Sequence, residues 1–359
     1  MAQAGSQLYH PVTLDRDTIA LKLYDRYGKK NPKLFRQYSA YQKARILEDF
    51  TSHLRYLQES LAIDDAAIFI DYIGWARVML ASLHVPYDYL SSSLALLREA
   101  LHEELPPDLK KKTDEYIEKS IAFLTTAPKE VPSFIRDTDR LAPVAYMYLD
   151  ALLTADRDAA RSIIDSQVKK GVAARDLYLS IFQPVLREVG RLWQMQKVSV
   201  AQEHFVTSAT QRMLAQVSLP VLNGSGKVPR RGKTLVAACV AEELHEVGIR
   251  MVADFFEMDG WDSYYIGANT PAQDLIAAVK ERKADVVALS STMAFHLPVV
   301  DYLIRSLRGD PATRYVKIIV GGYPFSIVPG LWQKIGADAY ANSADEAVAA
   351  GNRLSPVNS

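Results

Sequence analysis

The last third of the chain alternates short apolar runs with segments whose apolar residues recur at helical spacing. The apolar runs predict β-strands at Thr234–Val240, Asp262–Ile266, Val286–Leu289, Lys317–Val320 and Ala337–Tyr340. Between them the spacing predicts amphipathic helices at Val247–Met258, Ala272–Arg282, Val299–Leu307 and Ile327–Ile335. Continuous apolar strands that alternate with helices predict a doubly wound, Rossmann-like parallel α/β sheet.

Polar residues and glycines follow three of these strands. His245 lies in the loop after the first strand, Ser290 ends the third, and Gly321 and Gly322 follow the fourth. Ligands of such sheets bind outside the carboxyl ends of the strands. The pattern therefore predicts a ligand site at one edge of the sheet.

The middle of the chain has four segments with apolar residues at helical spacing and short breaks between them. These segments are Leu141–Leu153, Arg157–Lys170, Ala173–Gln194 and Ser199–Val221. Consecutive helices with short connections predict an up-and-down four-helix bundle.

The N-terminal region, residues 1–126, is predicted to be wholly helical. Its helices are expected at Leu14–Tyr27, Leu34–Leu61, Asp65–His84, Tyr87–Leu101 and Pro107–Thr125. It shows neither a helix-turn-helix pattern nor a concentrated positive face, so a DNA-binding module is not expected.

Two polar segments divide the chain, one from Ala127 to Pro132 and one from Gly224 to Lys233. They predict three domains: residues 1–130, 131–226 and 227–359. The basic residues of the second segment (Lys227, Arg230, Arg231 and Lys233) are interpreted as a solvated connector.

Composition narrows the class of protein. Lys plus Arg and Asp plus Glu both number 42, so bulk charge indicates neither nucleic-acid nor membrane binding. No stretch approaches the ~20 apolar residues of a membrane span, and the N-terminus lacks a signal-peptide pattern. Cys239 is the only cysteine, so a disulfide within the chain is impossible, which suits a cytoplasmic protein.

The segment Glu243-Leu244-His245-Glu246-Val247-Gly248 has the pattern E-x-H-x-x-G. Ser290-Ser291-Thr292 begins after 41 intervening residues, and Gly321-Gly322 follows after another 28. The three spaced elements resemble the cobalamin-binding domain of methionine synthase, corrinoid methyl carriers, mutases and cobalamin photoreceptors. The commonest form of that domain has Asp where this chain has Glu243.

This resemblance implies that a protein histidine replaces the cofactor's own base below cobalt, the base-off, His-on form. His245 would be that cobalt ligand, and Glu243 would hold its tautomer. The residues expected along the channel for the displaced nucleotide tail are Ser290, Thr292, Gly248, Gly321 and Gly322. The hydroxyls would bind the tail, and the glycines would let the backbone approach it.

A second motif lies in the predicted bundle: Trp193, nine intervening residues, then Glu203-His204. This spacing resembles the light-sensing adenosylcobalamin photoreceptors, whose best-known members carry a MerR-type DNA-binding domain. The resemblance implies that Trp193 packs against the adenosyl group and that Glu203 hydrogen-bonds it. His204 would coordinate cobalt from above after light breaks the cobalt–carbon bond. Taken singly, Trp193 is better interpreted as bundle core, and Glu203-His204 as a solvated helix face; the downstream cobalamin motif shifts the balance to the photoreceptor.

The segment from Phe69 to Pro86 resembles globin-like sensory domains without haem. The order of globin-like domain, bundle and cobalamin domain resembles the photocobilins, which pair cobalamin with biliverdin. The candidate bilin-binding residues are Tyr72, Trp75, Arg77, His84 and Tyr87. The aromatic rings would stack on pyrroles, Arg77 would pair with a propionate, and His84 would hydrogen-bond ring nitrogens or a lactam. Since Cys239 is the only thiol, the bilin would be held noncovalently; helix core and dimer packing remain the alternative for this set.

The leading hypothesis is a light sensor, not an enzyme, that uses adenosylcobalamin with biliverdin as second chromophore. Its expected partners are these chromophores, further copies of the chain in a light-dependent homo-oligomer, and an unknown downstream protein. The main alternative is a methyl-carrying corrinoid protein that serves a separate methyltransferase. That function needs an open upper cobalt face, which Trp193, Glu203 and His204 would crowd. A mutase subunit, which would need a substrate-binding barrel, and a carrier without light response are two further hypotheses.

Overall fold

The computed structural model describes residues 12–223 and 229–356, and the side chains of Tyr87 and residues 219–223 are not described. Part of the predicted connector, including Lys227, lies outside the described residues. The chain divides into two compact units. The first comprises Met1–Lys129, Thr292–Asp301 and Tyr323–Gly336, and the second comprises Glu130–Ser291, Tyr302–Gly322 and Ala337–Ser359.

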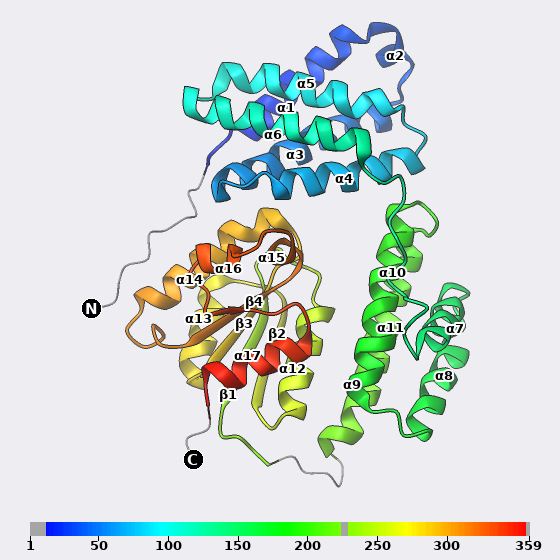
Figure 1. Ribbon diagram of the computed structural model, residues 1–359, viewed down its shortest axis with the longest axis vertical. Helices are drawn as coiled ribbons and strands as arrows, with labels where there is room; N and C mark the ends of the chain where they lie inside the picture. The colour runs from blue at the N-terminus through cyan, green and yellow to red at the C-terminus, as the bar shows by residue number, and fades with distance from the viewer. Residues whose placement is uncertain (1–11, 224–228, 357–359) are drawn as a thin grey trace. The chain divides into compact units, whose positions relative to one another are not determined.

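The first unit is built from helices (Figure 1). Its helices are α1 (Arg16–Lys30), α2 (Pro32–Gln37), α3 (Ala40–Ile63), α4 (Ala67–Ser82), α5 (Tyr87–Glu104), α6 (Pro107–Thr126), the 3₁₀ helix η2 (Ala294–His296), α15 (Tyr323–Ile327) and α16 (Leu331–Lys334). Apolar faces of α1, α3, α4, α5 and α6 enclose one core, in which Leu23, Phe50, Phe69, Leu97 and Ile117 are fully buried.

The predicted helix Leu34–Leu61 is two helices, because Ser39 starts a new one. Its hydroxyl accepts from the backbone N–H of Gln42, and the Gln42 side chain accepts from the backbone N–H of Ser39. This reciprocal capping box satisfies two of the donors that every helix start leaves without partners. The extended backbone that Ser39 needs as a cap separates α2 from α3.

The second unit begins with the bundle helices. These are α7 (Ala142–Leu153), α8 (Arg157–Lys169), α9 (Ala174–Leu177), the π-helix η1 (Tyr178–Phe182), α10 (Gln183–Gln194) and α11 (Val200–Asn223). The predicted single helix Ala173–Gln194 thus contains a π-helical turn. Tyr178, Ile181 and Phe182 of that turn are all fully buried, so the wider turn places bulky side chains in the core.

The same unit contains a five-stranded parallel sheet in the order β2-β1-β3-β4-β5 (Figure 1). The strands are β1 (Thr234–Val240), β2 (Asp262–Thr270), β3 (Val286–Ser290), β4 (Lys317–Gly321) and β5 (Ala339–Tyr340). The accompanying helices are α12 (Val247–Met258), α13 (Ala272–Arg282) and α17 (Ala344–Leu354). Helix α14 (Leu297–Gly309) is divided between the two units after Asp301. Figure 1 shows α12 and α17 on one side of the sheet and α13 on the other. This is the doubly wound topology that the strand–helix alternation predicts.

Alternate residues of β1 face different layers, as the pleat requires. Leu235, Ala237 and Cys239 join the core that α12, α17 and the bundle helices share. Every residue of β1 from Leu235 to Val240 is fully buried, which explains the continuous apolar run in the sequence. Within the described residues, no helix is long and apolar enough to cross a membrane.

Strand β2 is longer than its predicted range because two irregularities interrupt its pairing with β1. Ala237 pairs with Tyr265, Ala238 with Gly267 and Val240 with Thr270, so β2 contributes extra residues. Gly267 has a φ of 105°, a conformation that L side chains rarely adopt. Such bulges turn backbone groups away from the ladder, and here they free them for the loop that follows β1.

Candidate functional site

The loop between β1 and α12 carries the histidine of the E-x-H-x-x-G pattern. Nδ1 of His245 lies 2.6 Å from Oε1 of Glu243, and the same oxygen accepts from the His245 backbone N–H at 3.0 Å. The Glu243 side chain is fully buried, whereas 60% of the His245 side chain is exposed. The carboxylate thus holds the ring by Nδ1 and leaves Nε2 as the nitrogen that faces outward.

The longer Glu at this position still makes the hydrogen bond that the spacing predicts. That bond raises the pKa of His245, because it stabilises the protonated ring. Burial lowers the pKa, while the negative charges of Glu243 and Glu203 raise it further. The imidazole is consequently electron-rich, which favours a metal ligand once the ring is neutral.

The strand ends of β1, β3 and β4 lie in register beside this loop. Cys239 pairs with Ser290, and Ser290 pairs with Gly321. Ser290 and Ser291 are buried, and the Ser291 backbone N–H donates to the carbonyl of Gly321 at 3.1 Å. Thr292 follows directly and is half-buried.

Two glycines at this edge differ in what surrounds them. A Cβ on Gly322, whose φ is 107°, would lie 2.0 Å from the Ser291 carbonyl oxygen. A Cβ on Gly248 would meet nothing within 4 Å. Gly322 is therefore required by the protein's own packing, whereas the space over Gly248 is open to a ligand. A Cβ on Gly321 would lie 3.2 Å from the Ala341 carbonyl oxygen, so it also belongs to the close packing of the strand ends.

Glu246, which sequence reasoning did not single out, binds three donors from other elements. Its Oε1 accepts from Nε2 of Gln211 on α11 at 3.0 Å. Its Oε2 accepts from the Tyr265 hydroxyl at 2.9 Å and from the Ala268 backbone N–H at 3.1 Å, both on β2. Burial and the bond to Glu246 raise the pKa of Tyr265, so the hydroxyl keeps its proton and donates. The signal available in the sequence was an acidic residue directly after His245 at a helix start.

The W-x9-EH residues lie on either side of the turn between α10 and α11. Trp193 is half-buried in the last turn of α10, against the shared core. Glu203, in the first turn of α11, lies 2.6 Å from Nδ1 of His204 and accepts from the Thr207 hydroxyl at 2.9 Å. The His204 side chain is 74% exposed. Glu203 thus hydrogen-bonds His204, and its negative charge raises the pKa of His245.

The candidate bilin residues come from α4 and the segment after it. Tyr72 is buried and stacks on Tyr56, with ring centroids 4.1 Å apart, and on Trp75 at 6.5 Å. The Tyr72 hydroxyl lies 2.8 Å from Nδ1 of His53. Burial lowers the pKa of His53 to about 4, and its Nε2 has no hydrogen-bond partner among the described residues. Tyr72 is therefore packed among other aromatic rings of the same unit.

The remaining candidates are arranged differently. Nη1 of Arg77 donates to the Leu124 carbonyl at 2.6 Å, so α6 holds the guanidinium that was expected to pair with a propionate. His84 is exposed beyond the end of α4 and has a φ of 58°. Tyr87 begins α5, and its side chain is not described. The structure brings Tyr72 and Trp75 together, and the bilin role of the set stays a prediction.

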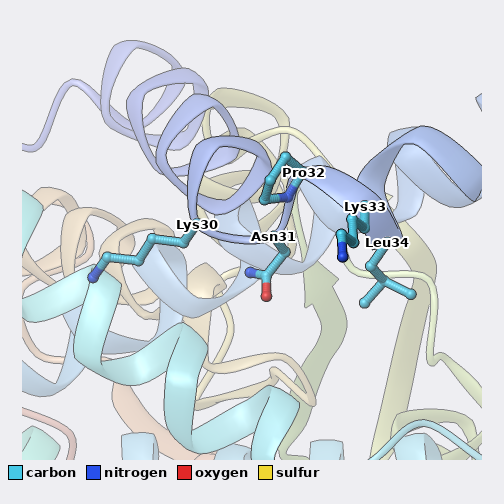
Figure 2. Close-up of a pocket in the computed structure, with 5 residues that line it drawn as sticks. All are labelled: Lys30, Asn31, Pro32, Lys33 and Leu34. Atoms are coloured by element: carbon cyan, nitrogen blue, oxygen red, sulfur yellow. The ribbon is translucent and has the colours of Figure 1, made fainter.

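A hollow of about 380 Å³ lies at the turn between α1 and α2, and Figure 2 shows the residues that line it. It is lined by Lys30, Asn31, Pro32, Lys33 and Leu34, which form a single turn of chain. None of the predicted site residues lines it.

Comparison with known families gives matches in three parts of the chain. Residues 144–218 and 233–350 match two families that are each described as a B12 binding domain. Residues 12–124 match the phycobilisome protein family. The E-x-H-x-x-G loop, and Gly321 and Gly322 at the end of β4, all lie inside the 233–350 match.

Dimethylamine corrinoid protein 3 of Methanosarcina mazei is 30% identical over 170 residues, which are 47% of this chain and 99% of that protein. The chain belongs to the corrinoid proteins. As a corrinoid protein with matches to B12 binding domains, it binds a cobalamin cofactor.

The Methanosarcina barkeri monomethylamine corrinoid protein has a similar structure, with a TM-score of 0.51 and 19% identity. The likeness covers 60% of this chain and all of that one. This likeness confirms the predicted fold class, in which helical parts precede a C-terminal Rossmann-like parallel α/β domain.

The predicted partners of this corrinoid protein are wrong in one respect. The sequence suggested a homo-oligomer with light-dependent assembly. The Methanosarcina mazei relative is named for dimethylamine, and another matched structure is titled as a methanol:cobalamin methyltransferase complex from Methanosarcina barkeri (15% identity, TM-score 0.32, 71% of this chain and 89% of that one). The relative is named as a corrinoid protein for dimethylamine, and this name gives no support to a light-dependent homo-oligomer. The error arose because the photoreceptor motif alone was used to infer the assembly.

Proposed function

We propose that cobalamin binds at the carboxyl ends of β1, β3 and β4, where His245 would hold its cobalt. The donor set supports this, because Glu243 holds Nδ1 and leaves Nε2 on an exposed ring. The open space above Gly248 supports it too, since a planar cofactor and its tail need backbone without side chains. Ser290, beside Gly321 in the sheet, would offer its hydroxyl to the tail.

We further propose that the chain is a methyl-carrying corrinoid protein serving a separate methyltransferase, rather than an enzyme by itself. The observation that carries this proposal is the relationship to dimethylamine corrinoid protein 3, almost all of which aligns with this chain. Bound cobalamin would supply a cobalt centre able to accept and release a methyl group. The protein's own residues would orient it: Glu243 fixes the imidazole, and Glu203 biases the proton on that ring.

Purified protein reconstituted with hydroxocobalamin tests the cobalt ligand. The visible and electron paramagnetic resonance spectra of the reduced form should show a nitrogen ligand from the protein, and His245→Ala should lose it. His102→Ala is a matched control, because His102 also pairs with a carboxylate, Asp114, at 2.7 Å but lies in the first unit. A nitrogen signal that survives in His245→Ala would contradict the assignment.

Light sensing with adenosylcobalamin and noncovalent biliverdin is the second candidate. It is favoured by the match of residues 12–124 to the phycobilisome protein family and by the W-x9-EH residues. Here Trp193 and Glu203 would enclose the adenosyl group, and His204, whose ring is exposed, would be the reserve ligand.

One pair of measurements separates the two functions. Methyl carriage predicts that reduced protein accepts a methyl group from a corrinoid methyltransferase and its methylamine substrate. Light sensing predicts that green light converts the adenosylcobalamin form to a photoproduct with His204 as a new nitrogen ligand, which His204→Ala lacks. The same photoproduct in wild type and His204→Ala, together with methyl uptake, would reject the sensor, and the reverse result would reject the carrier.

A further inference from the structure

The residue after His245 has a side chain committed to elements other than its own. Glu246 occupies the N-cap position of α12, where the shorter side chains of Ser, Thr, Asp and Asn ordinarily accept from the first N–H groups of the helix. It makes no such bond. Its two oxygens instead accept from Gln211 on α11 and from Tyr265 and Ala268 on β2.

The backbone of β2 is shaped to reach this carboxylate. The irregular pairing with β1 turns the Ala268 N–H toward Oε2 of Glu246. A Cβ on Gly267 would lie 3.4 Å from that oxygen, and the φ of 105° there favours glycine. The bulge and the glycine thus form one arrangement with Glu246.

The His245 loop is fastened to β2 at a second place. The Glu242 backbone N–H donates to Oδ1 of Asn269 at 2.8 Å, and the Asn269 N–H donates to the Glu243 carbonyl at 2.9 Å. Hydrogen bonds on both sides of His245 thus join its loop to β2 as one body. The hydrogen bond between Glu246 and Gln211 connects this body to helix α11 of the bundle.

We propose that Glu246 is a positioning residue that couples the axial histidine to helix α11. Because the His245 loop, Glu246 and β2 are joined as one body, a displacement of this body when cofactor binds at His245 is transmitted through the Glu246 carboxylate to Gln211. The position of α11, and with it of Glu203 and His204 in its first turn, changes together with the state of the lower ligand. This inference rests on the proposed role of His245 as lower ligand.

Two glutamines of α11 provide a matched comparison. Nε2 of Gln211 donates to Glu246 at 3.0 Å, and Nε2 of Gln216 donates to Asp165 of α8 at 2.9 Å. Both hydrogen bonds join a side-chain amide to a carboxylate, but only the bond of Gln211 connects α11 to an element outside the bundle. Gln211→Leu removes the proposed link without altering the loop or β2, and Gln216→Leu is its control.

The test is hydrogen exchange of α11 amides in the full chain, with and without hydroxocobalamin. In the wild type and in Gln216→Leu, cobalamin should slow the exchange of amides around residues 207–214. In Gln211→Leu this slowing should be lost, although the cofactor still shows its protein nitrogen ligand. Equal slowing in Gln211→Leu would overturn the coupling.

Substitutions of Glu246 itself keep the proposal testable if one variant folds poorly. Glu246→Gln retains an oxygen for the Ala268 N–H, and its amide can donate to Gln211 once that side chain turns over, so the slowing should be preserved. Glu246→Ala should lose it. Loss in both variants, or in neither, would reject Glu246 as the link. Absence of the nitrogen ligand from wild-type protein would instead reject the proposed function.

Discussion

At the scale of single residues, the site depends on two glycines that play different parts. Gly322 lies against the Ser291 backbone in a conformation that favours glycine, and Gly248 faces open space at the start of α12. A side chain at the first position collides with protein, whereas one at the second collides only with whatever binds there.

Alanine at each position separates these roles. Gly322→Ala should lower the free energy of unfolding by at least about 2 kcal/mol, because its Cβ would lie 2.0 Å from the Ser291 oxygen. Gly248→Ala should keep the stability of the cofactor-free protein and weaken cobalamin binding. Urea unfolding and spectroscopic titration check the pair; equal stability losses, or undiminished binding by Gly248→Ala, would contradict the assignment.

Asp49 offers a second test at this scale. Burial raises its pKa to about 6, and the Tyr89 hydroxyl, which donates to it at 3.1 Å, lowers the pKa again in part. A carboxyl whose pKa is raised by folding gives its full stability below the ordinary value of 3.8 and loses it as the pH rises through 6.

Asp49→Asn should therefore stabilise the protein at pH 8, by up to about 3 kcal/mol, because the amide stays neutral and can still accept from Tyr89. The gain should vanish near pH 4. Urea unfolding of variant and wild type at a series of pH values measures the difference, in which the titration of all other groups cancels. A gain that is independent of pH would refute this account.

At the scale of elements, the π-helical turn η1 connects the bundle to the sheet layer. It presents the Tyr178 hydroxyl to Oδ2 of Asp254 on α12 at 2.7 Å and to the Leu214 carbonyl on α11 at 3.1 Å. Burial raises the pKa of Asp254, and the Tyr178 hydroxyl lowers it. Arg175, one turn earlier, lies over the ring of Phe255 on the same helix as Asp254, 5.1 Å from its centroid. The Tyr178 hydroxyl thus joins η1, α11 and α12.

Tyr178→Phe should cost about 1–3 kcal/mol, because Asp254 loses its hydroxyl donor while it remains largely buried. Tyr146→Phe is the control: the Tyr146 hydroxyl donates to the Ile135 carbonyl at 3.1 Å but is partly exposed to water, so its loss should cost less. Thermal unfolding of both variants gives the comparison, and equal costs would show that the π-turn hydroxyl has no special part.

Prediction from sequence succeeded where burial produces a simple pattern. β1 is buried along its length, and α12 and α13 carry regular apolar stripes, so their bounds agree with the predicted ones. The end of β2 was missed because Gly267, Ala268 and Asn269 are there to form a bulge, which carries no apolar signal. The short helix α17 was not predicted, although Ser343 caps it and acidic residues fill its first turn.

In the candidate site too, contacts between residues close in the sequence could be predicted, whereas contacts between distant elements could not. The distance of two residues between Glu243 and His245 was enough to predict their hydrogen bond. The contacts of Glu246 join three elements that are distant in the sequence, and no local spacing indicates them. The stacking of Tyr72 with Tyr56 is likewise a tertiary contact, so the local pattern around Phe69 could not show that the ring is already packed against a neighbour.

At the scale of the whole molecule, the described residues form two hydrophobic cores, each built from its own helices and strands. One is formed by helices α1 to α6, and the other by the bundle together with the sheet. The matches to known families follow this division, with the phycobilisome protein family on one side and two B12 binding domains on the other.

Cofactor binding should therefore stabilise one core preferentially. At a free cobalamin concentration a hundred times the Kd, the linked gain is about 2.7 kcal/mol. Amides of β1, β3 and β4 should exchange more slowly with cobalamin present, while those of α1 and α5 should be unaffected. Comparable protection of both sets would show that the helical core takes part in binding the cofactor.

The bulged strand β2 has a consequence for the behaviour of the protein at high concentration. It forms one border of the sheet, and the other border, β5, has two residues. A flat nine-residue border would be a template on which foreign strands could add and start aggregates. The pairing irregularities that bring the Ala268 N–H to Glu246 also interrupt the regular backbone edge of β2. The same distortion that holds the His245 loop therefore disfavours the addition of a further strand to this edge.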